Sequence, residues 1–410
     1  MSLSRSDTSV LGRWWWTVDR WTLLAVATLI GFGYVMMLAA SPAVAERLHQ
    51  SRDVFLLKQV VFLALAGLVV VAVSLLSPKG VRRLALLGCL AALALTAATL
   101  VMGVEIKGAR RWISIPGMTV QPSEFLKPCF AVVAAWLLSE GHSETEWFAR
   151  VGSTASPSGT ARVQRNEVVC ATPQQRVQRF PGMALAGAVF AIIALLLKSQ
   201  PDMGMLAVVA AVFFVQLFIG GLNLMLVGVA AGGLVAAGVG AYTFFPHVRS
   251  RITRFMDPAS GDSYQVNTAL EAFGNGGLLG RGPGEGRVKD VLPDAHADFV
   301  FAVVGEEFGM IICLVLLCLF GFIVLRGLLR LLAEQDLFIV LASCGLVTSF
   351  GLQAFVNMGS ALHLIPTKGM TLPFVSYGGS SVLAVALDIG MLLALTRRRT
   401  RAEPVWGRSA

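Results

Sequence analysis

The sequence predicts an all-α membrane protein with about ten transmembrane helices and a large outer-face loop between the seventh and the eighth. Only 14% of the 410 residues are charged, whereas a soluble domain carries about 25%. Hydrophobic residues make up 56% of the chain, and the mean hydropathy is +0.72. Apolar runs of roughly 20 residues recur from end to end, and each is long enough to cross a bilayer as a helix. This composition excludes a disordered regulator, a coiled coil and a secreted disulfide scaffold.

Ten candidate spans follow one another, with boundaries good to a few residues. They are residues 21–40, 54–76, 84–102, 123–139, 183–198, 203–219, 222–245, 299–325, 337–362 and 381–396. A charged, Trp-rich stretch precedes the first span, and no A-x-A cleavage site follows, so we expect a retained span rather than a removed signal peptide. The tryptophans 14–16 and 21 fit either an interfacial belt or simple packing. Gly228 and Gly232 predict a helix packing contact in the seventh span.

Lysine and arginine residues orient these spans. An even number of spans puts both chain ends on one side. If that side is the cytoplasm, 18 Lys and Arg residues lie inside and 12 outside, six of them in the segment 246–298. This distribution agrees with the positive-inside rule. We therefore expect an inner-membrane protein with a cytoplasmic N-terminus (1–20), a ten-helix domain (21–396) and a basic cytoplasmic tail (397–410).

Two long segments lie outside the predicted spans. Residues 140–182 are polar and lack apolar periodicity, which predicts a flexible cytoplasmic insertion. Residues 246–298 form an outer-face loop, and loops of that length are usually functional or disordered. Its glycines permit close backbone approach to a ligand, with a flexible linker as the alternative. These glycines are Gly274, Gly276, Gly277, Gly280, Gly282, Gly284 and Gly286.

Several classes of site have no counterpart in the sequence. The six cysteines show no C-x-x-C spacing, and the five histidines form no His-x-x-His or HExxH pair. These patterns predict neither a metal site nor a redox site. No G-x-x-x-x-G-K-[ST] nucleotide loop occurs. The basic residues are scattered among short loops, which argues against a nucleic-acid partner.

Charged residues in or beside the lipid are the strongest functional signal, because each costs roughly 2.5–3.5 kcal/mol at the centre of a span. Glu124 and Lys127 lie at i and i+3 at the start of the fourth span, within reach of each other. They either line a polar pocket that opens outward or form an ion pair that only ties helices together. The preceding loop carries Lys107, Arg110 and Arg111, which suit phosphate oxygens, with lipid-headgroup anchoring as the alternative.

Asp298 lies at the outer mouth of the eighth span, two residues after His296. Three small residues fall within about 40° of its direction on a helix with 100° per residue. They are Ala302, Gly305 and Gly309. This stripe leaves room either for a ligand or for the close packing of another helix. Glu306 and Glu307 point elsewhere, and we expect them to pair with neighbouring helices.

The outer segment 363–380 contains two prolines and three glycines, so it cannot be one regular helix. Irregular backbone at membrane depth is tolerated only when it is buried or lines a cavity. Lys368 supplies another outer cation, and hydroxyls such as that of Ser376 favour a cavity wall over simple helix termination. Asp388, deep in the tenth span, fits either a structural hydrogen bond or a proton path.

The outer face thus gathers a carboxylate, several cations and broken polar backbone. An outer-face enzyme has no nucleotide supply, so its substrate must arrive already activated. A lipid-linked pyrophosphate sugar meets this need. The cations would stabilise charge on the departing pyrophosphate, and the carboxylate would take a proton from the attacking hydroxyl.

Five motifs in order resemble the SEDS family of cell-wall polymerases. They are GARRW (108–112), QPSEFLK (121–127), SQPDMG (199–204), AHADFVFAVVGEEFG (295–309) and PTKGMTLPFVSYGGSS (366–381). They extend over nearly the whole chain, and PTKG-TLP resembles the division branch rather than the elongation branch. Ala297 departs from the family pattern, in which Thr or Ser is common, and the insertion 140–182 is longer than the family leads us to expect.

The resemblance implies an inverting glycosyltransferase that polymerises lipid II at the outer face of the membrane during septal cell-wall synthesis. The family's catalytic carboxylate carries over to Asp298. The substrate-binding candidates are Arg111, Glu124, Lys127, Lys368, Arg110, His296 and Ser376. No metal ligand is assigned, and a divalent cation (Mg²⁺ or Mn²⁺) at the pyrophosphate is left open.

The implied partners are lipid II, membrane lipid, a class B penicillin-binding protein of the division transpeptidase (FtsI) type, and division proteins such as the FtsQ/FtsL/FtsB complex. A lipid II flippase is the competing function. A flippase needs polar groups at both faces, whereas the residues singled out here are almost all outward. A scaffold for division proteins would leave those outward charges unexplained.

Overall fold

Long helices make up most of the chain. The computed structural model describes residues 9–47, 52–106, 109–115, 118–141, 181–221, 224–256, 264–292, 294–366 and 369–398. Within these ranges a helix overlies each of the ten predicted spans. Six of the described helices are long and apolar enough to cross a membrane, and two further apolar helices have 17 residues each. The predicted fold class is confirmed, while the number of crossings stays a prediction.

The helices that overlie the predicted spans are α2 (Arg20–Arg47), α3 (Arg52–Ser74), α4 (Pro78–Met102), α5 (Pro122–Glu140), α7 (Gly182–Ser199), α8 (Met203–Ile219), α9 (Leu224–Phe244), α13 (Val300–Leu331), α14 (Leu337–Ala361) and α15 (Gly379–Leu395). A short helix, α1 (Val10–Thr17), precedes them within the predicted cytoplasmic N-terminus. The predicted insertion lies almost entirely outside the described residues, as do the outer cations Lys107 and Lys368.

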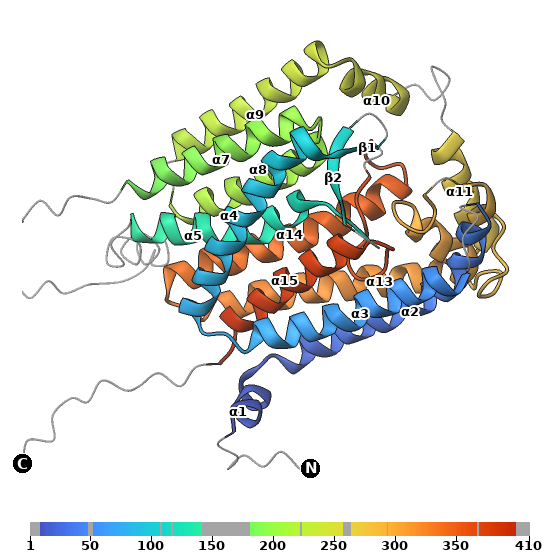
Figure 1. Cartoon of the computed structure of the whole chain (residues 1–410), viewed down its shortest axis with the longest axis horizontal. Coiled ribbons are helices and arrows are strands. Elements are labelled where there is room, and N and C mark those ends of the chain that lie inside the picture. Colours follow the sequence, from blue (N-terminus) through green and yellow to red (C-terminus); the bar gives the residue numbers. More distant parts are fainter. Residues whose placement is uncertain are drawn as a thin grey trace, which may run out of the picture.

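Three helices form the centre of the bundle: α5, α14 and α15 (Figure 1). Helix α5 packs against α4 and α14, and α15 packs against α3. Most residues of α14 and α15 are buried, which agrees with sequences that are apolar on all sides. Polar side chains on these central helices are therefore shielded from lipid, and they can make a site inside the protein.

A small antiparallel sheet follows α4, where the all-α prediction contains only a loop. Its strands are β1 (Val104–Ile106), β2 (Ala109–Ile115) and β3 (Met118–Val120), in the order β1-β2-β3. Three strands of three to seven residues have little sequence signal of their own, because their pairing is decided by contacts between neighbouring strands. The sheet leads directly into α5.

The predicted outer loop 246–298 carries secondary structure of its own. It contains α10 (Pro246–Met256), α11 (Tyr264–Gly276) and the short α12 (Val288–Val291). Helix α11 packs against α13. A Cβ atom at Gly276 or Gly280 would collide with the backbone of α13. These two glycines therefore allow close approach to a helix, rather than to a ligand or as part of a linker.

The same packing fills the small-residue stripe of α13. A Cβ atom at Gly305 would collide with the ring of Phe273 in α11, and one at Gly309 would collide with Gly280. Ala302 is fully buried. Of the two interpretations of this stripe, close packing is the one that the structure supports.

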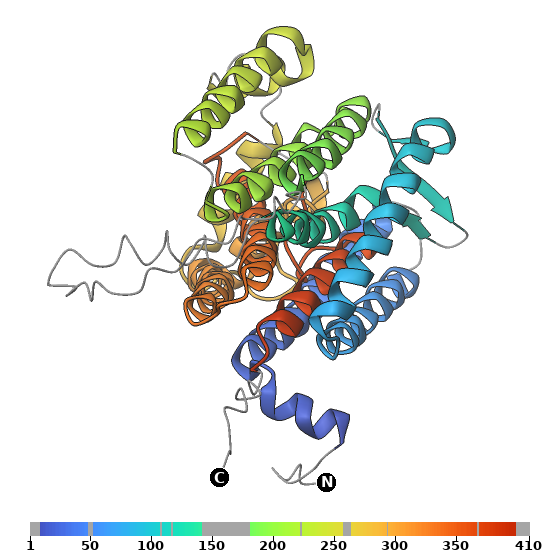
Figure 2. The same cartoon turned by 90° about the vertical axis from the view of Figure 1, so that its left-hand side faces the viewer.

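Helix α9 lies at the edge of the bundle together with α10 (Figure 2). A Cβ atom built at Gly228 or Gly232 would meet no described atom within 4 Å. The predicted packing contact at these two glycines is therefore wrong for the described part of the chain.

The two ends of the described chain lie together, because Arg398 N donates to the Thr17 carbonyl at 3.0 Å. An even number of spans requires such an arrangement. There the carboxylate of Asp19 accepts hydrogen bonds from Arg326 Nε at 2.6 Å and Nη2 at 2.9 Å, and lies 2.9 Å from Arg330 Nε. Arg330 also donates to the Thr396 carbonyl at the end of α15. Burial by itself raises the pKa of Asp19, but the hydrogen bonds from Arg326 and Thr22 and the nearby arginine charges outweigh it and lower the pKa.

The tryptophans near the N-terminus divide between the two predicted roles. Trp14 is buried, and its indole nitrogen donates to Ser74 Oγ at 2.8 Å. Trp21 is exposed on α2. Packing thus accounts for Trp14, whereas a position of Trp21 at the membrane interface stays a prediction.

Candidate functional site

Strand β2 separates the two arginines that the sequence places side by side. Successive residues of a strand point to opposite faces. Arg110 is opposite Glu105 on β1 and forms an exposed ion pair with it at 3.4 Å. Arg111 points the other way, toward the turn between α7 and α8. The two described arginines of the predicted basic group are therefore divided, and of these two Arg111 joins the interior of the site.

The α7–α8 turn holds Arg111 through three oxygens. Its Nε donates to the Gln200 carbonyl at 3.0 Å, and its Nη2 donates to the Pro201 carbonyl at 2.8 Å. The Asp202 carboxylate lies 3.5 Å from Nη1. Asp202 also caps α8 through Met205 N and accepts a hydrogen bond from Gln121 Nε2. The Arg111 side chain remains 28% exposed, so its guanidinium can still reach an anion.

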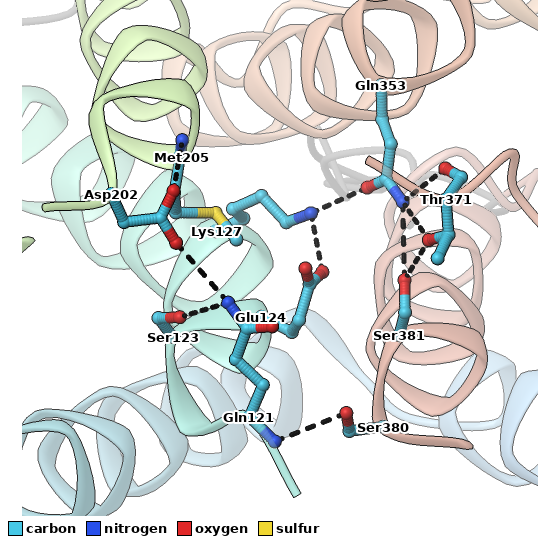
Figure 3. A network of polar contacts seen from close by, with 10 residues as sticks. All are labelled: Gln121, Ser123, Glu124, Lys127, Asp202, Met205, Gln353, Thr371, Ser380 and Ser381. Atoms are coloured by element: carbon cyan, nitrogen blue, oxygen red, sulfur yellow. Dashed lines mark hydrogen bonds and ion pairs between the residues drawn. The ribbon is translucent and has the colours of Figure 1, made fainter. Parts of the chain in front are cut away.

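Helix α5 brings Glu124 and Lys127 together as the i, i+3 spacing predicts. Lys127 Nζ lies 2.7 Å from Glu124 Oε2 and donates to Gln353 Oε1 on α14 at 2.6 Å (Figure 3). Lys127 is only 4% exposed. Through Lys127 the pair does tie two helices together, α5 and α14. The pair is also one end of a longer series of hydrogen-bonded polar residues.

Two amides on α14 continue that chain. Gln353 and Asn357 are one helical turn apart and therefore lie on the same face. Gln353 Nε2 donates to the Thr371 carbonyl at 3.1 Å and to its hydroxyl at 3.3 Å. Asn357 Nδ2 donates to the Met370 carbonyl at 2.6 Å and to the Asp298 carbonyl at 2.9 Å. The backbone of 369–371 thus runs along α14 from Asp298 to Gln353, which accepts the hydrogen bond from Lys127.

Asp298 lies in the turn that precedes α13 and is partly exposed. The segment 369–371 passes directly beside it, because a Cβ atom at Gly369 would lie 2.9 Å from Asp298 Oδ2. One connected set of contacts therefore joins the backbone carbonyl of Asp298 to the side chain of the buried Lys127. Its members are Asp298, Asn357, Met370, Thr371, Gln353 and Lys127.

Ser376 and His296 hold the two irregular segments of the site together. The Ser376 hydroxyl donates to the Ala297 carbonyl at 2.6 Å and accepts from Leu372 N at 2.7 Å. Tyr377 N donates to the His296 carbonyl at 2.9 Å, and the two rings lie 5.5 Å apart. Burial raises the pKa of Tyr377. Ser376 is fully buried, so its role here is to fix the turn that carries Asp298.

Three other acids do not belong to this chain of contacts. Glu306 and Glu307 are buried, and each pairs with a cation of the loop between α11 and α13, namely Arg281 and Lys289, rather than with a spanning helix. Asp388 is buried in α15, where it hydrogen-bonds to Ser349 and interacts with the charge of Lys127. The hydrogen bond supports its structural role, while a proton path stays a prediction.

Four residues of the site were not singled out in the sequence, namely Gln353, Asn357, Asp202 and Gly369, although a signal for three of them was present. Gln353 and Asn357 are polar residues at i, i+4 inside an apolar span, the same kind of signal that identifies Glu124 and Lys127. Asp202 belongs to the quoted SQPDMG motif. The position of Gly369 beside Asp298 had no local signal, because it depends on how the segment 363–380 folds back.

Metal ligation was tested against the side chains that come together in the structure. No group of three or more His, Cys, Asp or Glu side chains with metal-binding geometry occurs among the described residues.

Comparison with known proteins finds relatives that match nearly the whole chain. Residues 20–401 match the family model FTSW_RODA_SPOVE, described as "Cell cycle protein". The chain is 38% identical over 403 residues to the "Probable peptidoglycan glycosyltransferase FtsW" of Caulobacter vibrioides, covering 98% of this chain and 95% of that protein. It is 32% identical to the protein of the same name from Geobacter metallireducens, covering 92% and 94%.

Solved structures share the fold. One, described as "Structural coordination of polymerization and crosslinking by a peptidoglycan synthase complex", has a TM-score of 0.69 at 28% identity and covers 92% of this chain and 97% of that one. The rod shape determining protein RodA of Thermus thermophilus has a TM-score of 0.61 at 27% identity, covering 93% and 97%.

Proposed function

Because the chain belongs to the FtsW, RodA and SpoVE family of cell cycle proteins, we propose that the site around Asp298 polymerises lipid II at the outer face of the cytoplasmic membrane. The chain is a SEDS peptidoglycan glycosyltransferase that spans the membrane several times. Its relatives at 38% and 32% identity carry the name FtsW, which supports a role in septal cell-wall synthesis.

The contact chain from Asp298 to Lys127 is the observation that carries the proposal. A glycosyl transfer of this kind needs a base at the attacking oxygen and positive charge at the leaving pyrophosphate. Asp298 is partly exposed at one end of the chain, and the Lys127–Glu124 pair lies at the other. Asn357 and Gln353 fix the intervening backbone, so both groups are held by one rigid helix, α14.

In the proposed reaction, the Asp298 carboxylate removes the proton from the 4-hydroxyl of the acceptor's N-acetylglucosamine. The oxygen forms a bond to the anomeric carbon of the donor's N-acetylmuramic acid. The bond from that carbon to the pyrophosphate oxygen breaks on the opposite side, so the configuration inverts. Undecaprenyl pyrophosphate leaves with the electron pair, and the glycan chain grows by one disaccharide.

Arg111 and Lys127 differ in their access to the leaving pyrophosphate. Arg111 keeps an exposed part of its guanidinium, which suits direct contact with phosphate oxygens. Lys127 is buried and already bonded to Glu124 and Gln353, so it acts through its charge and through Gln353. Arg110 is exposed and paired with Glu105, which favours a peripheral role. Mg²⁺ or Mn²⁺ at the pyrophosphate remains part of the proposal, and no step depends on it.

A class B penicillin-binding protein is the proposed partner, because one structural relative is a complex described as coordinating polymerization with crosslinking. The proposed location is the division septum, with both chain ends in the cytoplasm. The common position of the two ends and the excess of Lys and Arg on that side support this orientation.

The test is polymerisation of labelled lipid II by the purified protein, alone and with its transpeptidase partner. Asp298→Asn should abolish polymer formation. Arg111→Ala should lower the rate by roughly 10²-fold, the usual cost of losing one charge-stabilising donor. Arg110→Ala is the matched control on the same strand, and it should stay within about twofold because exposed pairs contribute little.

Two outcomes would contradict the proposal. If polymer formation survives in Asp298→Asn, Asp298 is not the base. If sealed vesicles show lipid II crossing the membrane while no polymer forms under any condition, the flippase alternative is correct.

A further inference from the structure

Helix α13, which begins two residues after Asp298, is broken. Gly309 adopts φ 79° and ψ 179°, far from helical values, and divides α13 into an outer half (Val300–Phe308) and a longer inner half. In a continuous helix each N–H bonds to the carbonyl four residues earlier. The break therefore removes the bonds from Met310 N to Glu306 O and from Ile311 N to Glu307 O. Inside a protein at membrane depth, these four groups need other partners.

A bridging loop (Gly277–Gly282) supplies all four partners. Arg281 N donates to Glu306 O at 2.9 Å, and Gly282 N donates to Glu307 O at 3.0 Å. On the other side of the break, Met310 N donates to Gly277 O at 3.0 Å and Ile311 N to Leu278 O at 3.3 Å. Each missing helical bond is thus replaced by two bonds to the bridging loop. At the break, the outer half of α13 is therefore held by the backbone of this loop, in addition to its packing against α11.

Two side chains strengthen the same connection. Glu307 Oε1 lies 2.7 Å from Lys289 Nζ, and Glu307 Oε2 accepts from Gly284 N at 2.9 Å. Lys289 Nζ also donates to the Gly284 carbonyl at 2.6 Å and to the Ala39 carbonyl of α2 at 3.0 Å. Both side chains are almost fully buried. Lys289 therefore joins three elements: the loop before α12, the outer half of α13, and α2, whose Ala39 is 250 residues away in the chain.

The neighbouring pair is weaker. Arg281 Nη1 lies 3.7 Å from Glu306 Oε1, and its side chain is 37% exposed, compared with 7% for Lys289. Glu306 is itself fully buried, but the guanidinium of Arg281 is partly exposed and its contact is longer, so losing it should cost less than losing the short contact of the buried Lys289. The two pairs lie on adjacent residues of α13, which makes Arg281 a matched control for Lys289.

We propose that Lys289 and Glu307 are positioning residues that set the place of Asp298 by fixing the outer half of α13 against the loop and α2. This inference rests on the proposed function of Asp298. A helical segment of nine residues is too short to be stable alone, so its orientation follows the contacts that hold it. Asp298 lies at its outer end, and a displacement of about 1 Å at a reacting group costs up to 10²-fold in rate.

The test compares Lys289→Met, Lys289→Arg and Arg281→Met in the full-length protein. Lys289→Met should lower kcat for lipid II polymerisation at least tenfold with KM within about twofold, because the base moves while the substrate contacts remain. Lys289→Arg should recover most of the rate, and Arg281→Met should lower kcat clearly less than Lys289→Met does. A role in overall stability alone would not produce this division between kcat and KM.

Hydrogen–deuterium exchange provides a readout that does not depend on activity. Lys289→Met should raise exchange in Val300–Phe308 and in the bridging loop, while α5 and α14 keep wild-type protection. Glu307→Gln is the second variant in case Lys289→Met does not fold, since it leaves Lys289 with two carbonyl partners, and it should give the same local increase.

Unchanged kcat in Lys289→Met, or exchange that rises uniformly over all helices, would overturn the positioning role. A wild-type protein that makes no polymer would instead refute the proposed function. In that case the exchange measurement would still decide whether Lys289 and Glu307 hold the outer half of α13.

Discussion

Gly369→Ala tests the contact between the segment 369–371 and the proposed base. The added Cβ atom would lie 2.9 Å from Asp298 Oδ2, whereas an ordinary contact begins at 3.4 Å. The carboxylate must therefore move by about 0.5 Å, roughly half of the 1 Å displacement that costs up to 10²-fold in rate. On a logarithmic scale this predicts a loss of about tenfold. The free energy of unfolding should change by about 1 kcal/mol or less, because a short side chain can rotate away.

The assay is polymerisation of labelled lipid II, with thermal unfolding measured on the same preparation. Gly359→Ala is the control, because its Cβ atom would lie 3.3 Å from the Ile365 side chain rather than near Asp298. It should stay within about twofold of the wild-type rate. A wild-type rate in Gly369→Ala would refute the argument, as would a loss of activity that only follows a loss of stability.

Two further predictions concern stability. Lys127→Met leaves the Glu124 carboxylate, whose side chain is only 13% exposed, without its cationic partner. This change should cost about 3 kcal/mol in unfolding free energy, whereas a double variant with Glu124→Leu should cost clearly less; equal losses would contradict this. The pKa of Asp19 is lower in the folded protein than in the unfolded chain, where it is about 3.9. The ionised carboxylate therefore stabilises the fold fully above that unfolded pKa, and this stabilisation is lost as the pH falls through the lower folded pKa. Thermal unfolding from pH 7 to 3 should therefore show a smaller acid-induced loss in Asp19→Asn than in the wild type.

Local sequence patterns accounted for more of the fold than of the site. The helices that overlie the ten predicted spans could be located because lipid exposure demands apolar side chains over a fixed length. The ion pair between Glu124 and Lys127 could be predicted because it depends only on helical spacing. In contrast, the separation of Arg110 from Arg111 required knowing that their segment forms a strand, which three short paired strands do not reveal in sequence.

The glycines of the outer loop show the limit of such patterns. Their number indicated close backbone approach, but the sequence did not show that the approaching element is α13. The bridging loop compensates for the break at Gly309 through four backbone bonds, and backbone bonds carry no side-chain signature. The partner of each glycine is visible only once the two segments are placed together.

By itself the sequence determined the class of protein, the position of its apolar helices and the polar residues that had to be accounted for, because hydropathy and helical spacing are local properties. The tertiary structure alone decided which of those polar residues meet. Lys127 and Gln353 are 226 residues apart in the chain, and Asp298 and Asn357 are 59 apart. Such contacts arise from the packing of whole helices, whose energy is shared among many side chains and cannot be assigned to any one motif.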